Sequence, residues 1–275
     1  MKKNRIAALL LSISLLGTAF LTGCSSQNTN QATGTTAGDL LVQIQEKSEI
    51  VIAMEGTWAP WTYHDENDEL VGYDVEVGKA IAEKLGVTAT FVEGEWDGLL
   101  AGLDAGRYDI MFNGVGITPE RQEKYDFTTP YAYNRTAVIV RGDYDEISSM
   151  EDLNGKKTAN TISSTYAEQA EAYGATVTGV DDLNQTIELL LAGRIDATLN
   201  AEVVFADYQK AHPDANIKIA AYSDDVERVA IPVRKGTDTA TLLDAINQAL
   251  AELDADGTLS ALSVKYFGTD ISKMS

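Results

Sequence analysis

Segments with strand and helix patterns alternate along most of this 275-residue chain. Amphipathic stretches typical of helices separate short apolar runs typical of strands, which lie at 50–54, 89–92, 108–112, 136–140, 195–199, 217–220 and 229–233. One predicted helix begins with Asp74 as its N-cap and ends at Gly86. Such alternation predicts parallel β-sheets covered by helices on both faces, so the expected fold class is α/β.

Two short patterns each occur twice, in the same order. Residues 103–110 (LDAGRYDI) and 190–197 (LLAGRIDA) both join the end of an amphipathic helix, a glycine, an arginine and a strand that an aspartate introduces. Residues 140–143 (VRGD) and 233–236 (VRKG) form the second pair. The repetition indicates two lobes built on one plan, each with its own α/β sheet, and a chain that crosses between them.

The charge and the residue inventory exclude several functions. The chain carries 21 basic and 42 acidic residues, a formal charge of −21, which disfavours electrostatically driven nucleic-acid binding and repels anionic lipid. His64 and His212 are the only histidines and Cys24 is the only cysteine. We find no metal-ligand spacing, no Ser/His/Asp pattern and no glycine-rich phosphate loop. The sequence therefore predicts no catalytic residue, no metal site and no cofactor.

Residues 1–23 have the pattern of a secretory signal peptide. Lys2, Lys3 and Arg5 precede an apolar run at 6–20. About 15 apolar residues are too few to span a membrane, which takes about 20. The composition of residues 24–38 indicates Cys24 followed by a flexible, uncharged linker rich in Ser, Thr, Gln and Gly.

Cys24 has two interpretations. A single cysteine cannot form an intramolecular disulfide, so the simplest interpretation is a free thiol. The segment Leu21–Cys24 instead resembles a bacterial lipoprotein lipobox. That resemblance implies a lipidated Cys24 at the mature N-terminus. The protein would then be extracytoplasmic, and only this lipid would hold it to the outer face of the cell membrane.

Seven motifs follow one another through nearly the whole of residues 48–272. They are GTWAPW (56–61), VGYDV (71–75), WDGLL (96–100), ITPER (117–121), YDFTTPY (125–131), DLNGK (152–156) and DGTL (256–259). Together they resemble the extracellular solute-binding proteins of family 3, the polar-amino-acid receptors of ABC importers. Residues 96–131 are most similar to the cystine-type branch of that family.

The resemblance implies a periplasmic-binding-protein-like type II fold, with two α/β lobes joined by a two-strand hinge. Lobe 1 would comprise residues 39–133 plus 229–275, and lobe 2 residues 134–228. An amino acid would bind between the lobes, which close around it. The expected partners are this small-molecule ligand and the transmembrane subunits of an ABC permease, and the expected oligomeric state is a monomer.

The strongest candidate for the ligand carboxylate is Arg121. Guanidinium binds a carboxylate through two charge-assisted hydrogen bonds. Pro119 suits the first position of a helix that Thr118 caps, and the free N–H groups of a helix start also attract an anion. The residue types alone leave open a surface arginine paired with Glu120 or Glu123.

Three further positions precede Arg121, at the carboxyl end of the 108–112 strand, where ligands of open α/β sheets bind. They are Asn113, Gly114 and Gly116. The resemblance assigns the Gly114 carbonyl to the ligand ammonium and the Gly116 N–H to its carboxylate. The alternative is a plain turn.

In the predicted lobe 2, Ser164 and Thr165 stand where the family directs N–H groups at the carboxylate. Capping of a helix alone is the alternative. The aspartate that usually binds the ammonium falls on Ala201 in this sequence. Glu202 or Asn200 is the expected substitute, and an acid that only starts a helix is the alternative for Glu202.

All three tryptophans lie in the motifs, and the resemblance makes Trp58, Trp61 and Trp96 the walls of a side-chain pocket, with Glu55 and Tyr63 at its rim. The alternative is that they pack the core. The sequence thus favours a lipid-anchored receptor that delivers an amino acid, with L-cystine as first choice, to a permease. Two other hypotheses stay open: a cyclohexadienyl dehydratase, with Glu202 or Glu55 as acid or base, and a binding module that feeds a sensor.

Overall fold

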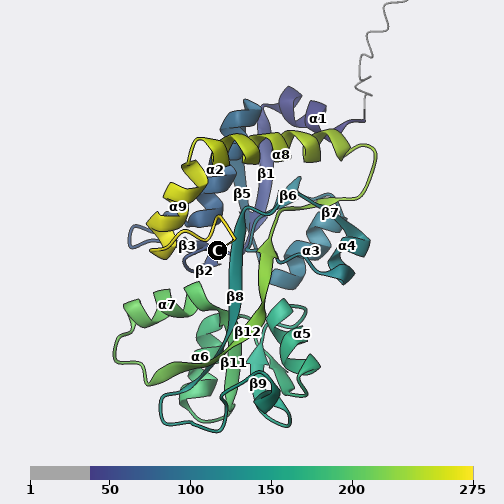
Figure 1. The fold of residues 1–275 in the computed structure, drawn as a ribbon. Coiled ribbons are helices and arrows are strands. Elements are labelled where there is room, and N and C mark those ends of the chain that lie inside the picture. The colour runs from purple at the N-terminus through teal and green to yellow at the C-terminus, as the bar shows by residue number, and fades with distance from the viewer. Residues whose placement is uncertain (1–37, 275) are drawn as a thin grey trace, which may run out of the picture. The chain divides into compact units, whose positions relative to one another are not determined.

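A three-stranded parallel sheet of order β5–β1–β6 is the centre of lobe 1 in the computed structural model, which describes residues 38–274. It consists of β1 (Glu49–Met54), β5 (Thr88–Glu93) and β6 (Ile110–Met111). Helices α1 (Leu40–Lys47), α2 (Tyr73–Leu85) and α3 (Trp96–Asp104) contact the sheet, and α8 (Ala240–Ala255) and α9 (Thr258–Phe267) pack on α2 (Figure 1). The strand expected at 108–112 is shorter, because only Ile110 and Met111 pair with β1.

Smaller elements complete this lobe. Three short strands form an antiparallel sheet, β2 (Thr57–Trp58), β3 (Thr62–His64) and β4 (Leu70–Val71). The short helix α4 (Pro119–Lys124) leads directly into β7 (Tyr125–Phe127), which pairs with β13 (Pro232–Arg234). The strand expected at 229–233 is therefore divided between β13 and the end of a longer strand, β12 (Ile217–Val229).

Lobe 2 contains a five-stranded sheet of order β10–β9–β11–β8–β12. Its remaining strands are β8 (Ala132–Arg141), β9 (Lys157–Asn160), β10 (Thr176–Gly179) and β11 (Ala197–Ala201), and its α-helices are α5 (Thr165–Ala172), α6 (Leu183–Leu191) and α7 (Glu202–Ala211). A 3₁₀ turn, η1 (Glu151–Leu153), precedes β9. The purely parallel sheet that we expected is wrong for this lobe, because β8 runs antiparallel to both of its neighbours.

Strands β8 and β12 carry the chain between the two lobes, as Figure 1 shows. Because one strand enters lobe 2 and the other leaves it, they pair antiparallel, from Ile217↔Arg141 to Val229↔Ala132. This pair is the two-strand hinge of the expected fold. The boundaries at 133/134 and 228/229 stay a prediction.

The repeated sequence pattern corresponds to a repeated structure. In lobe 1 the Asp109 carboxylate accepts a hydrogen bond from Val51 N (2.8 Å), while the Asp109 N–H donates to Val51 O (3.0 Å). In lobe 2 Asp196 does the same with Lys157, with both distances 2.8 Å. The preceding glycines, Gly106 and Gly193, both have positive φ (66° and 65°). The same turn therefore ties a helix to a neighbouring strand in each lobe.

The second repeat packs on the first. A Cβ atom built on Gly106 would lie 3.6 Å from Arg234 Cζ, and one built on Gly193 would lie 2.9 Å from Arg141 Nη1. Arg234 also donates to the carbonyls of Leu103 (3.3 Å) and Tyr108 (3.0 Å). Each arginine thus covers the helix-to-strand turn of its own lobe.

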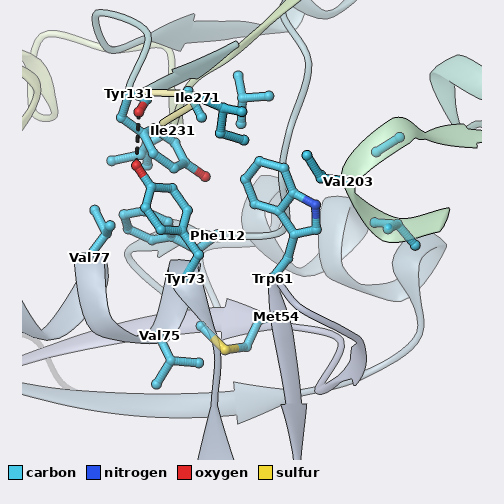
Figure 2. Close-up of a cluster of buried hydrophobic side chains, with 14 of the residues drawn as sticks. Met54, Trp61, Tyr73, Val75, Val77, Phe112, Tyr131, Val203, Ile231 and Ile271 are labelled. Atoms are coloured by element: carbon cyan, nitrogen blue, oxygen red, sulfur yellow. Dashed lines mark hydrogen bonds between the residues drawn. The ribbon is translucent and has the colours of Figure 1, made fainter. Parts of the chain in front are cut away.

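Aromatic side chains fill the core of lobe 1 next to the hinge (Figure 2). Trp61, Tyr73 and Tyr131 are all buried to 1 % exposure or less. The Tyr73 hydroxyl donates to Tyr131 O (3.0 Å), the contact drawn as a dashed line in Figure 2. Since Tyr131 immediately precedes β8, this core fixes the start of the hinge strand.

Asp74 is not the N-cap that the sequence predicts. Gly72 occupies that position, and Asp74 lies fully buried in the first turn of α2. Its carboxylate accepts hydrogen bonds from the Tyr131 hydroxyl and from Gly114 N, both at 2.7 Å. Burial raises the pKa of Asp74 to about 7, because the loss of hydration outweighs the hydrogen bonds from Tyr131 and Gly114. Asp74 therefore links α2, the hinge strand and the loop after β6.

None of the helices between residues 38 and 274 combines the length and the apolar character that crossing a membrane requires. The predicted signal peptide, Cys24 and most of the predicted linker lie outside the described residues.

We expect Asp74→Asn to change how stability depends on pH. Between about pH 4 and pH 7 the folded protein holds a proton on Asp74 that the unfolded chain releases, so the free energy of unfolding falls as pH rises. The variant should lack this loss and gain about 1.4 kcal/mol over the parent per pH unit in that window. Urea denaturation from pH 4 to pH 8 measures it.

Burial also raises the pKa of Glu55 to about 7, so the comparison is made in the Glu55→Gln background. Parallel pH profiles of parent and variant would contradict the prediction.

Candidate ligand-binding cleft

A cavity with about 640 Å³ of empty space, part of it open to solvent, is lined by residues of both lobes. Most of the site residues predicted from the sequence line it, namely Glu55, Trp58, Trp96, Asn113, Gly114, Arg121, Ser164, Thr165 and Asn200. Glu55, Asn113 and Asn200 stand at or just beyond the carboxyl ends of β1, β6 and β11. The topology therefore brings together side chains that are far apart in the sequence.

Arg121 is buried in the wall of this cavity, with 7 % of its surface exposed. The Thr118 hydroxyl accepts from Arg121 N (3.1 Å) and Pro119 begins α4, so the predicted cap is confirmed. Glu120 pairs instead with Lys124, and within residues 38–274 no carboxylate lies within 4.0 Å of the Arg121 guanidinium. Burial lowers the pKa of Arg121 from its ordinary value. The surface ion pair that the residue types left open is thus absent from the described chain.

The guanidinium group of Arg121 is nevertheless oriented by three contacts. Nη1 donates to Gly116 O (3.1 Å), Nη2 donates to Ser163 O (3.0 Å), and Cζ lies 5.2 Å from the centre of the Trp96 ring. A guanidinium has five N–H donors. Donors therefore remain for a carboxylate in the cavity, which would pair directly with a cation that Glu168 and Glu227 reach only through longer-range attraction.

Two hydrogen bonds join the lobes next to the cavity. The Arg121–Ser163 bond joins α4 of lobe 1 to the loop before α5 of lobe 2. The Ser163 hydroxyl also donates to Asp97 in the first turn of α3. In this structure the two lobes therefore meet around the site.

The cavity also has an acidic wall. The Glu55 carboxylate accepts from Asn113 Nδ2 (2.6 Å), while Asn113 Oδ1 accepts from Glu55 N (2.9 Å). Burial raises the pKa of Glu55 to about 7, and the carboxylates of Glu95, Asp182 and Asp97 add to this effect. Asp182, the N-cap of α6, lines the cavity from the other lobe. A cation placed between Glu55 and Asp182 would restore the charged form of Glu55.

The three tryptophans contribute to the aromatic part of the site in different ways. Trp58 lines the cavity and stacks on Trp61, with ring centres 5.7 Å apart. Trp61 is 1 % exposed and does not line the cavity, so it supports Trp58 from beneath. Trp96 lines the cavity next to Arg121.

Four other predicted residues, Gly116, Thr118, Glu202 and Tyr63, do not line the cavity. Thr118 caps α4, and Gly116 lies against the carboxylate of Glu227, where a Cβ atom would be 2.1 Å from Oε1. Glu202 is the first residue of α7 and does not line the cavity. Tyr63, which we expected at the rim, does not line it either. Ser164 is the N-cap of α5, as predicted, and also lines the cavity.

Sequence reasoning missed several lining residues, among them Asn160, Tyr166 and Asp182. Asn160 is the last residue of β9, and Asp182 follows the end of β10. The rule that ligands bind at the carboxyl ends of parallel strands, applied to the second lobe as well as the first, would have found both.

Comparison with known proteins now identifies the family. Residues 50–269 match the family of bacterial extracellular solute-binding proteins, family 3. The chain belongs to this family. Its two-lobed α/β fold and the resemblance stated from the seven motifs are thereby confirmed.

The most similar proteins that we compared are amino-acid-binding proteins. The chain is 38 % identical to the L-cystine-binding protein TcyA of Bacillus subtilis, over 98 % of this chain and all of that one. It is 39 % identical to a probable amino-acid ABC transporter-binding protein of Haemophilus influenzae, over 94 % of this chain and 98 % of that one. The unliganded, open L-cystine solute receptor of Neisseria gonorrhoeae is 41 % identical, with a TM-score of 0.59, covering 85 % and 99 % of the two chains.

These relatives are binding proteins, which confirms the expectation of a binding protein rather than an enzyme. The chain is an amino-acid-binding protein of the ABC-transporter solute-binding class, and its family is extracellular. The dehydratase hypothesis is accordingly dropped.

We expect Gly114→Ala to destabilise the protein more than Gly86→Ala. Both glycines have positive φ (53° and 74°), so alanine costs about 1 kcal/mol of backbone strain at either site. Only at Gly114 would the new Cβ collide with another group, because it would lie 2.6 Å from Trp58 Cζ3, whereas nothing lies within 4 Å at Gly86. Overpacking should add about 1–3 kcal/mol at Gly114, measured by urea denaturation. Equal losses in the two variants would show that Trp58 does not rest on Gly114.

Proposed function

We propose that this protein binds L-cystine between its lobes and delivers it to the transmembrane subunits of an ABC permease, as a monomer anchored by lipid on Cys24. The observation that carries the proposal is the pairing of a buried Arg121, without a carboxylate partner in the described chain, with an acidic wall that includes Glu55 and Asp182. The cystine-binding relatives support the choice of ligand.

Cystine fits this distribution of charge because it has an amino-acid group at each end. Arg121 would bind the carboxylate of one end through paired hydrogen bonds. The second ammonium group would lie near Glu55 and Asp182. The disulfide between the two ends would then lie against the ring of Trp58, since sulfur contacts aromatic rings favourably. Closure of the lobes would bury the ligand and present both lobe tips to the permease.

A second candidate ligand is an amino acid with a cationic side chain, such as arginine. Among the residues that line the cavity Arg121 is the only basic one, while Glu55 and Asp182 are both acidic. Such a wall accepts the side-chain cation of arginine as readily as the second ammonium of cystine. The choice between them therefore needs a binding measurement.

We expect L-cystine to raise the midpoint of thermal unfolding of ligand-stripped protein by roughly 10 °C at a thousand times its dissociation constant. Arg121→Lys should weaken binding by roughly 10- to 100-fold, because lysine cannot make the paired contact, while Arg107→Lys at the surface serves as the control. Glu55→Gln should weaken cystine and arginine more than leucine, which lacks a second cation. A larger shift with arginine than with cystine would favour the second candidate.

No shift with any amino acid would contradict the proposed ligand class. Equal losses in the Arg121 and Arg107 variants would contradict the assignment of Arg121 to the carboxylate.

The lipid anchor has its own test. We expect full-length protein expressed in a bacterium that processes lipoproteins to incorporate labelled palmitate and to sediment with membranes. Cys24→Ala should remove both properties and release the protein, whereas Ser25→Ala should change neither. Membrane attachment that persists in the Cys24 variant would show that another segment holds the protein.

A further inference from the structure

Asn160 ends strand β9 inside lobe 2 and is 4 % exposed. Its side-chain nitrogen Nδ2 donates a hydrogen bond to Leu199 O on the neighbouring strand β11, at 2.7 Å. A carbonyl oxygen can only accept, so the amide group must turn its nitrogen towards Leu199. This contact fixes which way the other end of the amide, Oδ1, points.

Oδ1 of Asn160 is buried and has no hydrogen-bond partner within residues 38–274. A buried acceptor without a donor is unfavourable, and most such groups in proteins are paired. Asn160 lines the cavity between the lobes, so a ligand there can supply the missing donor.

Other buried polar atoms without partners do not fit this role. Thr158 lies on the same strand but does not line the cavity. Trp96 lines the cavity, but its indole Nε1 is itself a donor. Asn134 does not line the cavity either. Among the fully buried side-chain atoms without a partner in residues 38–274, Asn160 Oδ1 is thus the acceptor that belongs to the cavity wall.

The adjacent strand β11 ends without a carboxylate. Ala201 carries only a methyl group, and Asn200 Oδ1 already accepts a hydrogen bond from Ala201 N at 2.8 Å. We propose that Asn160 Oδ1 accepts a hydrogen bond from the α-ammonium group of the bound amino acid, as a neutral acceptor where a carboxylate is missing. The proposal rests on amino-acid binding in the cavity and does not require the ligand to be cystine.

The test measures dissociation constants by calorimetry with two pairs of probes. L-Cystine is compared with 3,3′-dithiodipropionic acid, and L-arginine with 5-guanidinovaleric acid; the second member of each pair lacks the α-ammonium. Asn160→Leu should weaken the binding of cystine or arginine by roughly 10- to 100-fold, since a hydrogen bond to a charged group is lost. It should leave the binding of the deaminated probes within about twofold.

Two further variants separate this role from packing. Asn160→Asp keeps the size and offers one oxygen to the ammonium while the other, protonated, can donate to Leu199 O, so it should bind amino acids at least tenfold more tightly than Asn160→Leu. Thr158→Val removes another unpaired buried polar atom of β9 away from the cavity and should leave ligand affinity unchanged.

Three results would overturn the proposal: unchanged affinity in Asn160→Leu, equal losses with and without the α-ammonium, or no recovery in Asn160→Asp. If the parent protein binds neither cystine nor arginine, the proposed ligands fail but Asn160 is still tested, with the L-amino acid that stabilises the parent protein most and its own deaminated analogue.

Discussion

The antiparallel pairing of β8 with β12 is the constraint on which the rest of the structure depends. At its lobe 1 end, Val229 pairs with Ala132 and also forms a bridge with Gly116. Bonds from Ile117 N to Arg228 O (2.9 Å) and from Ala230 N to Val115 O (3.0 Å) fix the same loop, which leads into Arg121. In lobe 2, β8 pairs with β11, whose Leu199 carbonyl holds Asn160. One pair of strands therefore positions binding residues of both lobes, so that a rotation at the hinge moves each set as a unit.

Asp74, Arg121 and Glu55 all lose hydration on burial, but only Arg121 and Glu55 line the cavity. Asp74 keeps two strong donors, Tyr131 and Gly114, and serves to hold the loop in place. Arg121 donates to two carbonyl oxygens and faces the ring of Trp96, while the carboxylates of Glu168 and Glu227 act on it without forming an ion pair. Burial raises the pKa of Glu55 to about 7. Groups with such incomplete compensation in a cleft are typical of functional sites. A ligand with a carboxylate at one end and an ammonium group at the other would stabilise the charged forms of both, and this complementarity explains why the cleft suits amino acids.

The two lobes share a repeated turn, but they line the cavity with different kinds of side chain. The Asp109–Val51 and Asp196–Lys157 contacts are the same turn in two places, so both lobes direct the carboxyl ends of their parallel strands towards the hinge region. The residues beyond those strand ends differ. Lobe 1 supplies Arg121, Trp58 and Glu55, whereas lobe 2 supplies amide and hydroxyl groups and Asp182. The shared turns therefore determine where the strand ends lie, and the different loops beyond them determine which polar and charged groups face the ligand.

The sequence by itself determined the features that depend on neighbouring residues. The caps at Thr118 and Ser164, the helix end at Gly86, the repeat and the family motifs are all local patterns, because each involves residues a few positions apart. Only the tertiary structure decided which side chains face the cavity. It placed Glu202 on a helix start away from the cavity, moved Asp74 from a helix cap into the core, and brought Asn160 and Asp182 into the cavity wall. The physical reason is that these outcomes depend on strand register and on the meeting of two lobes, and no short window of sequence records either.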